Sequence, residues 1–337
     1  MNQKQNQTPD ASRTPETPET LDVLIAGGGA AGLAAAVTLA RSRRSVAVVD
    51  GGQPRNAPAE GVHALLGREG ISPAELLAAG RREVTGYGGV VLDGEIAAVR
   101  RLEGGEGEDG GGGAGFEATL NDGRVLTARQ LLIATGLIDE LPPIPGLAEH
   151  WGRSVIHCPY CHGWEVRDRS ILVLGTSANS VHQALLFSQL SADVRFLADT
   201  AHGPGLDAEQ ARQLAARGVE VITGEAAAVE SENGGAPNGE TRLAGVRLAG
   251  GELLPAEVIV VAPRMLARTE AFEGLGVQTE ENPMGRFIPV DASGWTGVPG
   301  VWAAGNVADL SAQVGAAAAA GTLAAARLNA ELVMERL

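Results

Sequence analysis

A glycine-rich turn between an apolar strand and an alanine-rich helix constrains the fold of this chain more than any other feature of its sequence. Residues 21–26 read LDVLIA, the turn reads GGGAAG, and LAAAVTLARS has helix-forming composition. A second apolar strand, SVAVVD, follows and ends at Asp50. Strand, turn, helix and strand within about 30 residues predict a β-α-β unit.

Gly27, Gly29 and Gly32 have the G-x-G-x-x-G spacing of a dinucleotide-binding turn. The first glycine permits the tight turn, the second lets the backbone approach a pyrophosphate, and the third lets the helix pack on the strand. The helix amino terminus attracts the anion. Asp50 ends the next strand, where it can accept a hydrogen bond from a ribose hydroxyl. A merely structural turn is the alternative, but the three parts together favour a dinucleotide site.

The same theme returns in the second half of the chain. The apolar strand SILVLG precedes a helical stretch and the strand DVRFLAD, which ends at Asp199. A further apolar strand follows in each half, LLIATG and VIVVAP, and GVWAAGN with a long helix at 314–337 closes the chain. Alternating strands and helices predict an α/β protein. We expect two Rossmann-like three-layer domains, the second inserted into the first.

Linker and loop composition sets the expected domain limits. The proline-rich segment LPPIPG ends the first region at residue 146. We expect the first domain over 21–146 and 264–337, the second over 147–263, and a disordered polar tail over 1–20. The pattern also predicts a helix at 72–82, strands at 90–99 and 116–126, and flexible loops at 104–115 and 232–240.

Charge and cysteine content exclude several classes of function. A net charge of −15 repels nucleic acid and anionic membrane surfaces. No uninterrupted apolar run reaches about 18 residues. Two cysteines are too few for a disulfide-stapled secreted fold. The amino terminus lacks the apolar stretch of a signal peptide, so we expect a soluble, cytoplasmic protein.

The segment HCPYCHGWE carries the chemistry of the second half. Cys158 and Cys161 are spaced to form a small disulfide ring that cycles between dithiol and disulfide. His162 follows directly and can hold or donate the proton that thiol exchange needs, although a packed or solvent-facing histidine is the plainer interpretation. His150, His182 and His202 have no chemical context, and we expect them on the surface.

Three other interpretations of this segment are open. The string C-x-x-C-H fits c-type haem attachment, but no export signal is present. One C-x-x-C with histidines fits zinc, but no second ligand pair follows at the usual spacing. CPYC also resembles a glutaredoxin site, but that site belongs near the start of a small thioredoxin-like domain, whereas this one lies between two nucleotide folds.

The order of these motifs resembles the low-molecular-weight thioredoxin reductase family. A dinucleotide turn, an IATG strand, a C-x-x-C ahead of a second such turn, and a terminal GVWAAGN follow one another from about residue 21 to the end. Within that family, C-x-x-C-H-G-W-E is similar to the branch with the gliotoxin-type dithiol oxidases. The resemblance implies FAD on the first module and a homodimer. It also implies Cys161 against the flavin, with Cys158 meeting the substrate and His162 where the reductases carry an acidic proton donor.

The resemblance also implies the rest of the flavin site. The loop after Asp50 suits phosphate and ring contacts, His63 is a candidate to face the flavin, and Gln313 begins the last helix. The expected cofactor-binding residues are Gly27, Gly29, Ala30, Ala31, Gly32, Asp50, Gly51, Gln53, Arg55, Asn56, His63, Ile96, Thr135, Gly136, Gly305, Asn306, Gln313 and Val314. No metal ligands are expected.

Three departures from the family pattern affect the cofactors. Ser177 and Ser180 replace the later glycines of the second turn, and a side chain at Ser177 obstructs a pyrophosphate. Asp199 lies in the cluster that binds the 2′-phosphate of NADPH in the reductases, where a carboxylate repels it. Asn306 replaces an aspartate that bonds the flavin, and an amide oxygen can still accept. NAD(P)H therefore stays an open question, whereas FAD does not.

The leading function is an FAD-dependent thiol/disulfide oxidoreductase that acts on a dithiol or disulfide, either a small molecule or a thioredoxin-like protein. The degraded second turn favours dithiol oxidation, or a donor other than NADPH. One alternative is an NAD(P)H-dependent reductase of thioredoxin or of a small disulfide. An alternative of another class is a non-catalytic flavin-binding redox sensor.

Overall fold

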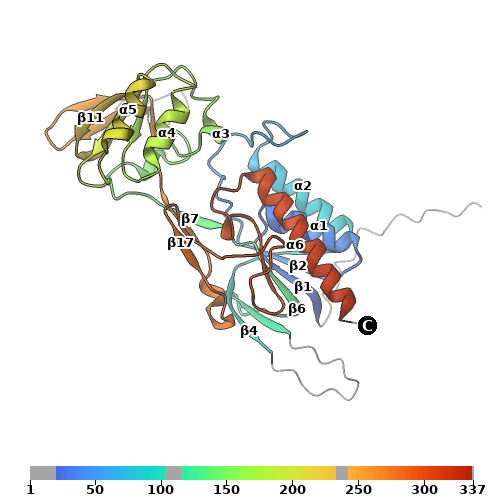
Figure 1. Cartoon of the computed structure of the whole chain (residues 1–337). Coiled ribbons are helices and arrows are strands. Elements are labelled where there is room, and N and C mark those ends of the chain that lie inside the picture. The colour runs from blue at the N-terminus through green and yellow to red at the C-terminus, as the bar shows by residue number, and fades with distance from the viewer. Residues whose placement is uncertain (1–19, 103–114, 233–241, 336–337) are drawn as a thin grey trace, which may run out of the picture.

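The computed structural model describes residues 20–102, 115–232 and 242–335. The predicted tail at 1–20 and the predicted loops at 104–115 and 232–240 lie almost wholly outside these residues. The described chain forms two modules joined through a small sheet (Figure 1). Both are α/β units built on parallel strands, as the sequence predicts.

The first module is built on a 7-stranded sheet of order β3-β2-β1-β6-β5-β4, with β19 also paired to β6. Strands β1, β2, β3, β6 and β19 run parallel, and β4 and β5 are antiparallel additions. The strands are β1 (Leu21–Ala26), β2 (Val46–Asp50), β3 (Val90–Asp93), β4 (Ile96–Arg101), β5 (Phe116–Leu120), β6 (Val125–Ile133) and β19 (Val301–Ala303).

Two strands expected from the sequence are each divided by a turn. The apolar run at 90–99 breaks at Gly94, whose φ of +149° is rarely adopted by residues with a side chain. The run at 116–126 reverses at Gly123, so that β5 and the start of β6 form a hairpin. Each turn contains an Asp-Gly dipeptide, at 93–94 and at 122–123, which is a turn signal that the sequence interpretation did not use.

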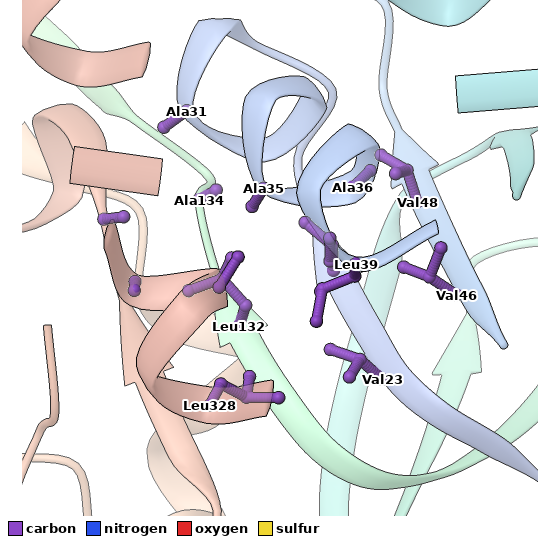
Figure 2. Packing of buried hydrophobic residues seen from close by; sticks show 14 of the residues in the cluster. Val23, Ala31, Ala35, Ala36, Leu39, Val46, Val48, Leu132, Ala134 and Leu328 are labelled. Atoms are coloured by element: carbon purple, nitrogen blue, oxygen red, sulfur yellow. The ribbon is translucent and has the colours of Figure 1, made fainter. Parts of the chain in front are cut away.

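Helices α1 (Ala30–Arg41), α2 (Pro73–Gly86) and α6 (Val314–Met334) cover one face of this sheet. Val23 and Val46 from the strands pack there against Leu39 of α1 and Leu328 of α6 (Figure 2). On the other face, Phe116 packs with residues of the 3₁₀ helix η2 (Glu270–Leu275). A further 3₁₀ turn, η3 (Gly305–Val307), follows β19.

Small residues let α1 and α6 approach each other closely. A Cβ atom at Gly321 would overlap the carbonyl oxygen of Ala31. The alanine-rich composition of both helices thus has a packing role, because backbone contacts backbone where they cross.

The second module repeats the strand order of the first in a 5-stranded parallel sheet, β11-β10-β9-β15-β8. Its closing strand, β8, comes before the rest of the module, whereas β19 comes last in the first module. The elements are η1 (Ala148–His150), β8 (Val155–Ile156), α3 (Pro159–His162), β9 (Ile171–Leu174), α4 (Ser180–Phe187), β10 (Val194–Asp199), α5 (Ala208–Ala216), β11 (Glu220–Gly224) and β15 (Val258–Val260).

Two smaller sheets complete the fold, the first antiparallel and the second mixed. A 3-stranded sheet of β12 (Ala226–Glu232), β13 (Arg242–Leu248) and β14 (Leu253–Pro255) packs on the second module. A 4-stranded sheet joins the modules, with order β17-β18-β16-β7. Its strands are β7 (Leu137–Glu140), β16 (Arg264–Ala267), β17 (Glu280–Asn282) and β18 (Gly285–Phe287). The chain leaves the first module after β7 and returns through its antiparallel neighbour β16.

The expected surface position of His150 is wrong. Its side chain is buried, and Nε2 lies 2.9 Å from the hydroxyl of Ser231. His182 is exposed as expected, and His202 is half-buried beside Asp199. Among the helices of the described ranges, none is long and apolar enough to cross a membrane.

The α1–α6 contact predicts a position-specific loss of stability. Gly321→Val should lower the free energy of unfolding by about 1–3 kcal/mol, because the new side chain forces two backbones apart. Thr322→Val adds a similar side chain one residue away on the exposed surface and should change little. Urea unfolding of both variants measures the difference, and equal stabilities would contradict the close packing.

Candidate functional site

A cavity of about 1080 Å³ extends from the first glycine turn to the cysteine pair, so both modules line it. Cys158, Cys161 and His162 line its second-module end. Of the residues expected to bind the cofactor, only Gly32 is not among the lining residues. The others, all in the wall, are Gly27, Gly29, Ala30, Ala31, Asp50, Gly51, Gln53, Arg55, Asn56, His63, Ile96, Thr135, Gly136, Gly305, Asn306, Gln313 and Val314.

The first glycine turn is open toward this cavity. Gly27, with φ +107°, lies against the backbone of Ala134, and a Cβ atom at Gly32 would overlap the carbonyl oxygen of Gly27. A Cβ atom at Gly29 would meet no atom within 4 Å. No side chain caps the amino terminus of α1. The turn therefore offers helix N–H groups and empty space to an anion.

The second turn, after β9, is closed by its own side chains. The hydroxyl of Ser180 accepts a hydrogen bond from the Ser177 amide at 3.2 Å, and the hydroxyl of Ser177 accepts one from the Asn179 amide at 3.1 Å. Gly203 packs against the carbonyl oxygen of Gly175, at the start of the turn. Amides that could bind a phosphate thus have partners within the chain.

Contrary to the expectation from the sequence, the side chain of Asp199 does not point toward a bound nucleotide. Its buried carboxylate accepts hydrogen bonds from the amides of Ala201 at 3.0 Å and His202 at 3.3 Å, and lies 2.9 Å from His202 Nδ1. These bonds fold the loop after β10 back on the strand end. Asp199 therefore faces its own loop and not a ribose phosphate, so its effect on a nucleotide is indirect.

The corresponding acid of the first module has a partner that sequence reasoning missed. Asp50 accepts from the Gly52 amide at 3.1 Å, and its other oxygen lies 2.7 Å from Arg81 of α2. Arg81 also pairs with Asp93 at 2.7 Å. Asp50 and Asp93 are neighbours in the β2–β3 register. Two adjacent carboxylates indicate a cation between them, and this signal could have identified Arg81.

The two cysteines are free thiols at the start of α3, with their sulfur atoms 2.8 Å apart. Cys158 is the N-cap residue, and Cys161 Sγ donates its hydrogen bond to Cys158 Sγ. This bond, helped by the Cys161 and Tyr160 amides, lowers the pKa of Cys158 to about 7. The same bond, together with burial, raises the pKa of Cys161. The two thiols are therefore chemically unequal, with the negative charge on Cys158.

Two histidines flank the pair, and both are kept neutral. Burial, with Arg55 nearby, lowers the pKa of His157 to about 4. Burial also lowers the pKa of His162. Neither ring nitrogen of His162 has a hydrogen-bond partner among the described residues. A neutral imidazole with an unoccupied nitrogen in the cavity wall can accept a proton from a thiol.

Arg55 and Gln183 fix the surroundings of the cysteines. The guanidinium of Arg55 makes two hydrogen bonds of 2.7 Å to Asp139 of β7, which ties the loop after β2 to the sheet between the modules. Gln183 of α4 donates to the carbonyl of His157 at 2.9 Å, immediately before Cys158. Sequence reasoning missed Gln183, and its signal was a single amide in an otherwise apolar stretch of a buried helix.

His63 and Asn306 take more definite positions than the sequence indicated. His63 Nδ1 lies 2.7 Å from Glu69, and Nε2 lies 3.5 Å from Glu165 of the second module. The amide nitrogen of Asn306 donates to the carbonyls of Asp309 at 3.0 Å and Ala312 at 2.9 Å. Because the amide nitrogen faces these two carbonyls, the amide oxygen of Asn306 points away from them. Asn306 also lines the cavity.

Comparison with known proteins gives consistent matches. The family model described as pyridine nucleotide-disulphide oxidoreductase matches residues 21–321. The thioredoxin reductase sirT of Leptosphaeria maculans is 29% identical over 93% of this chain and 94% of its own length. The thioredoxin reductase tcpT of Claviceps purpurea is 37% identical, over 50% of this chain and 51% of its own length. For tcpT and similar curated relatives, this chain thus spans about half of their length.

Solved structures are similar over nearly the whole chain. The crystal structure of HlmI has a TM-score of 0.84 and 43% identity, and the match covers 95% of this chain and 94% of that one. The oxidoreductase from Agrobacterium tumefaciens has a TM-score of 0.82 and 33% identity, with 94% and 99% covered. Both matches therefore include the two modules and the sheet between them.

The thiol hydrogen bond predicts how a lone Cys158 reacts with iodoacetamide. In Cys161→Ser the hydroxyl still donates, and alkylation should rise with a midpoint below the ordinary thiol value. In Cys161→Ala the donor is lost, so the midpoint should move upward and the rate at pH 7 should fall by roughly tenfold. Rates measured against pH on the cofactor-free variants test this. Identical midpoints would show that the Cys161 side chain does not set the acidity of Cys158.

Proposed function

Because the chain belongs to the pyridine nucleotide-disulphide oxidoreductase family, we propose that it is an FAD-dependent thiol/disulfide oxidoreductase that moves electrons between the flavin and the Cys158/Cys161 pair. One observation carries the proposal: an open dinucleotide turn and a polarised cysteine pair line the same cavity. A pair with unequal thiols is suited to turnover, which argues against a sensor without catalysis.

The residues of the first module fit FAD. The space at Gly29 and the uncapped amino terminus of α1 suit a pyrophosphate, and Asp50 lies beside the turn for a ribose. The cavity continues from this turn toward the cysteines, past Thr135, Asn306 and Gln313. Bound there, the flavin supplies a two-electron acceptor and donor. Members of the family bind FAD, and the lining residues of this chain are consistent with that cofactor.

The protein side chains supply the thiol chemistry. In the oxidising direction, a substrate thiolate attacks Cys158 Sγ, the Cys158–Cys161 bond breaks, and Cys161 leaves as a thiolate. The second substrate thiolate then attacks the substrate sulfur of the mixed disulfide and releases Cys158. Two protons lost by the substrate balance the two thiols formed on the protein. His162, neutral in the cavity wall, is placed to take these protons and return them.

The second module supports dithiol oxidation over use of NAD(P)H. The serine hydroxyls at Ser177 and Ser180 satisfy amides that would otherwise bind a pyrophosphate. Each hydrogen bond to a charged group that is lost costs about 1.5–3 kcal/mol. The substrate is a dithiol, either a small molecule or one carried by a thioredoxin-like protein. The exposed rings of Tyr160 and Trp164 beside the cysteines offer it an apolar contact.

A second copy of the chain is the partner we propose for α6. Its exposed residues include Leu323, Val333 and Met334, and alanines at 316, 319, 320, 326 and 330. Their spacing of three and four places them on one face of the helix. Arg327, four residues after Leu323, is a charged residue on this largely apolar face, and an exposed face of this kind marks an interface. The domain limits and the cytoplasmic location stay predictions from the sequence.

The electron donor tests the proposed function. Under nitrogen, dithiothreitol should reduce the flavin faster than NADH or NADPH at equal concentration, by at least about tenfold, because two phosphate-binding amides are already occupied. Stopped-flow absorbance of the flavin measures all three rates. Rapid saturable reduction by NADPH would instead support an NAD(P)H-dependent reductase, and absence of a flavin spectrum after reconstitution with FAD would remove the proposal.

The α6 face predicts a dimer that one charge disrupts. Ala319→Glu should convert the dimer to monomer, since a carboxylate cannot be buried without a partner and no charged residue lies three or four positions from Ala319 in α6. Thr85→Glu places the same charge at an exposed position of α2, outside that face, and should leave the dimer intact. Sedimentation velocity of the two variants and the wild type decides the question. A monomeric wild type, or equal behaviour of the two variants, would contradict this interface.

A further inference from the structure

Four titratable side chains connect the cavity to the surface where the two modules meet. His162 lines the cavity, and Glu165 follows it by three residues in a turn that the Val166 amide closes onto the His162 carbonyl at 3.3 Å. Residues three apart on a helical turn are neighbours. Glu165 Oε1 lies 3.5 Å from His63 Nε2, and His63 Nδ1 lies 2.7 Å from Glu69 Oε1. The Glu69 side chain is 66% exposed.

The loop that carries His63 is shaped to make these contacts. Ala64 has φ +56°, a left-handed conformation that costs free energy for a residue with a side chain. The Ala64 amide donates to Glu69 Oε2 at 2.9 Å, so the same carboxylate holds both the strained residue and the imidazole. The hydrogen bond from His63 holds the pKa of Glu69 below its usual value, so Glu69 is a carboxylate at neutral pH.

His63 lines the cavity, so the flavin-facing role that the sequence suggested stays a prediction beside the contacts described here. The titratable groups facing His162 are Glu165 and His63, and His157 lies on the side of the cysteines. His63 therefore stands between two carboxylates, one from each module. An imidazole between two acceptors can take a proton at one nitrogen and release one from the other.

The chemistry of the cysteine pair requires such a route. When two thiols re-form the Cys158–Cys161 bond, two electrons pass to the flavin and two protons leave the sulfur atoms. Any proton that does not follow the electrons must reach solvent from a cavity whose nearest base, His162, has both ring nitrogens buried. Because burial lowers the pKa of His162, His162 cannot hold that proton at neutral pH and must pass it on.

We propose that Glu165, His63 and Glu69 form a proton relay between His162 and solvent, built across the contact between the two modules. The relay rests on the proposed function, because it serves the protons of the thiol/disulfide cycle. It assigns His63 and Glu165 as residues that act through His162. The Glu165 side chain is itself 40% exposed, whereas the path through His63 and Glu69 crosses to the first module.

The test is anaerobic reduction of the FAD-loaded protein by dithiothreitol, followed by flavin absorbance across pH, in H₂O and in D₂O. His63→Gln should slow the reduction by at least about tenfold, because it keeps the size and polarity but cannot carry a proton. Added imidazole should restore most of the rate, and the solvent isotope effect should exceed that of the wild type. Glu165→Gln, as a second variant if His63→Gln folds poorly, should show the same slow rate and larger isotope effect.

Glu60→Gln is the matched control, because it removes an exposed carboxylate from the same loop without touching the relay. It should match the wild type in rate and in isotope effect. A His63→Gln rate equal to that of Glu60→Gln, or a slow rate with no rescue and an unchanged isotope effect, would overturn the relay and leave a structural role. A wild type that no dithiol reduces would remove the proposed function, and the relay with it.

Discussion

The first turn of an α-helix leaves backbone N–H groups without partners inside the helix. The two modules satisfy the amides at this position of the fold in different ways, and this difference gives the modules different roles. At α1 the glycines keep side chains away, so the amides face the cavity. At the second turn, serine hydroxyls accept from the amides of Ser177 and Asn179, which lead into α4. The same strand order therefore yields one open nucleotide turn and one closed turn. The second module is left to present the cysteine pair.

Presenting that pair takes contacts between the modules and within the second module. Gly152 lies against Pro58, where a Cβ atom would be within 2.6 Å of the proline ring. Arg55 binds Asp139 of the connecting sheet, and Gln183 holds the backbone before Cys158. Each contact is short and polar or closely packed. Together they hold a helix of one turn, α3, over the cavity, although α3 buries none of its own residues.

The sequence alone predicted the fold class, the inserted order of the modules and part of the cavity wall. Those features depend on local patterns: glycine spacing at Gly27, strand composition before it, and the separation of Cys158 from Cys161. Arg81, Gln183 and the partners of His63 were not predicted. They depend on the register of β2 with β3, on helix packing and on contacts between modules, and none of these leaves a local pattern. The same cause explains the buried His150, whose partner Ser231 is distant in the chain.

The second module begins and ends at one place, because β7 and β16 are antiparallel neighbours. An insertion with adjacent ends disturbs its host little, since the host needs only to bridge a short gap. In the chain, β8 comes before the other strands of its sheet, whereas β19 comes last in the first module. This change of order brings the two ends of the second module together. The module is thus a cassette: during evolution, the electron partner of such a protein could change by exchanging this one continuous segment, while the first module kept its cofactor.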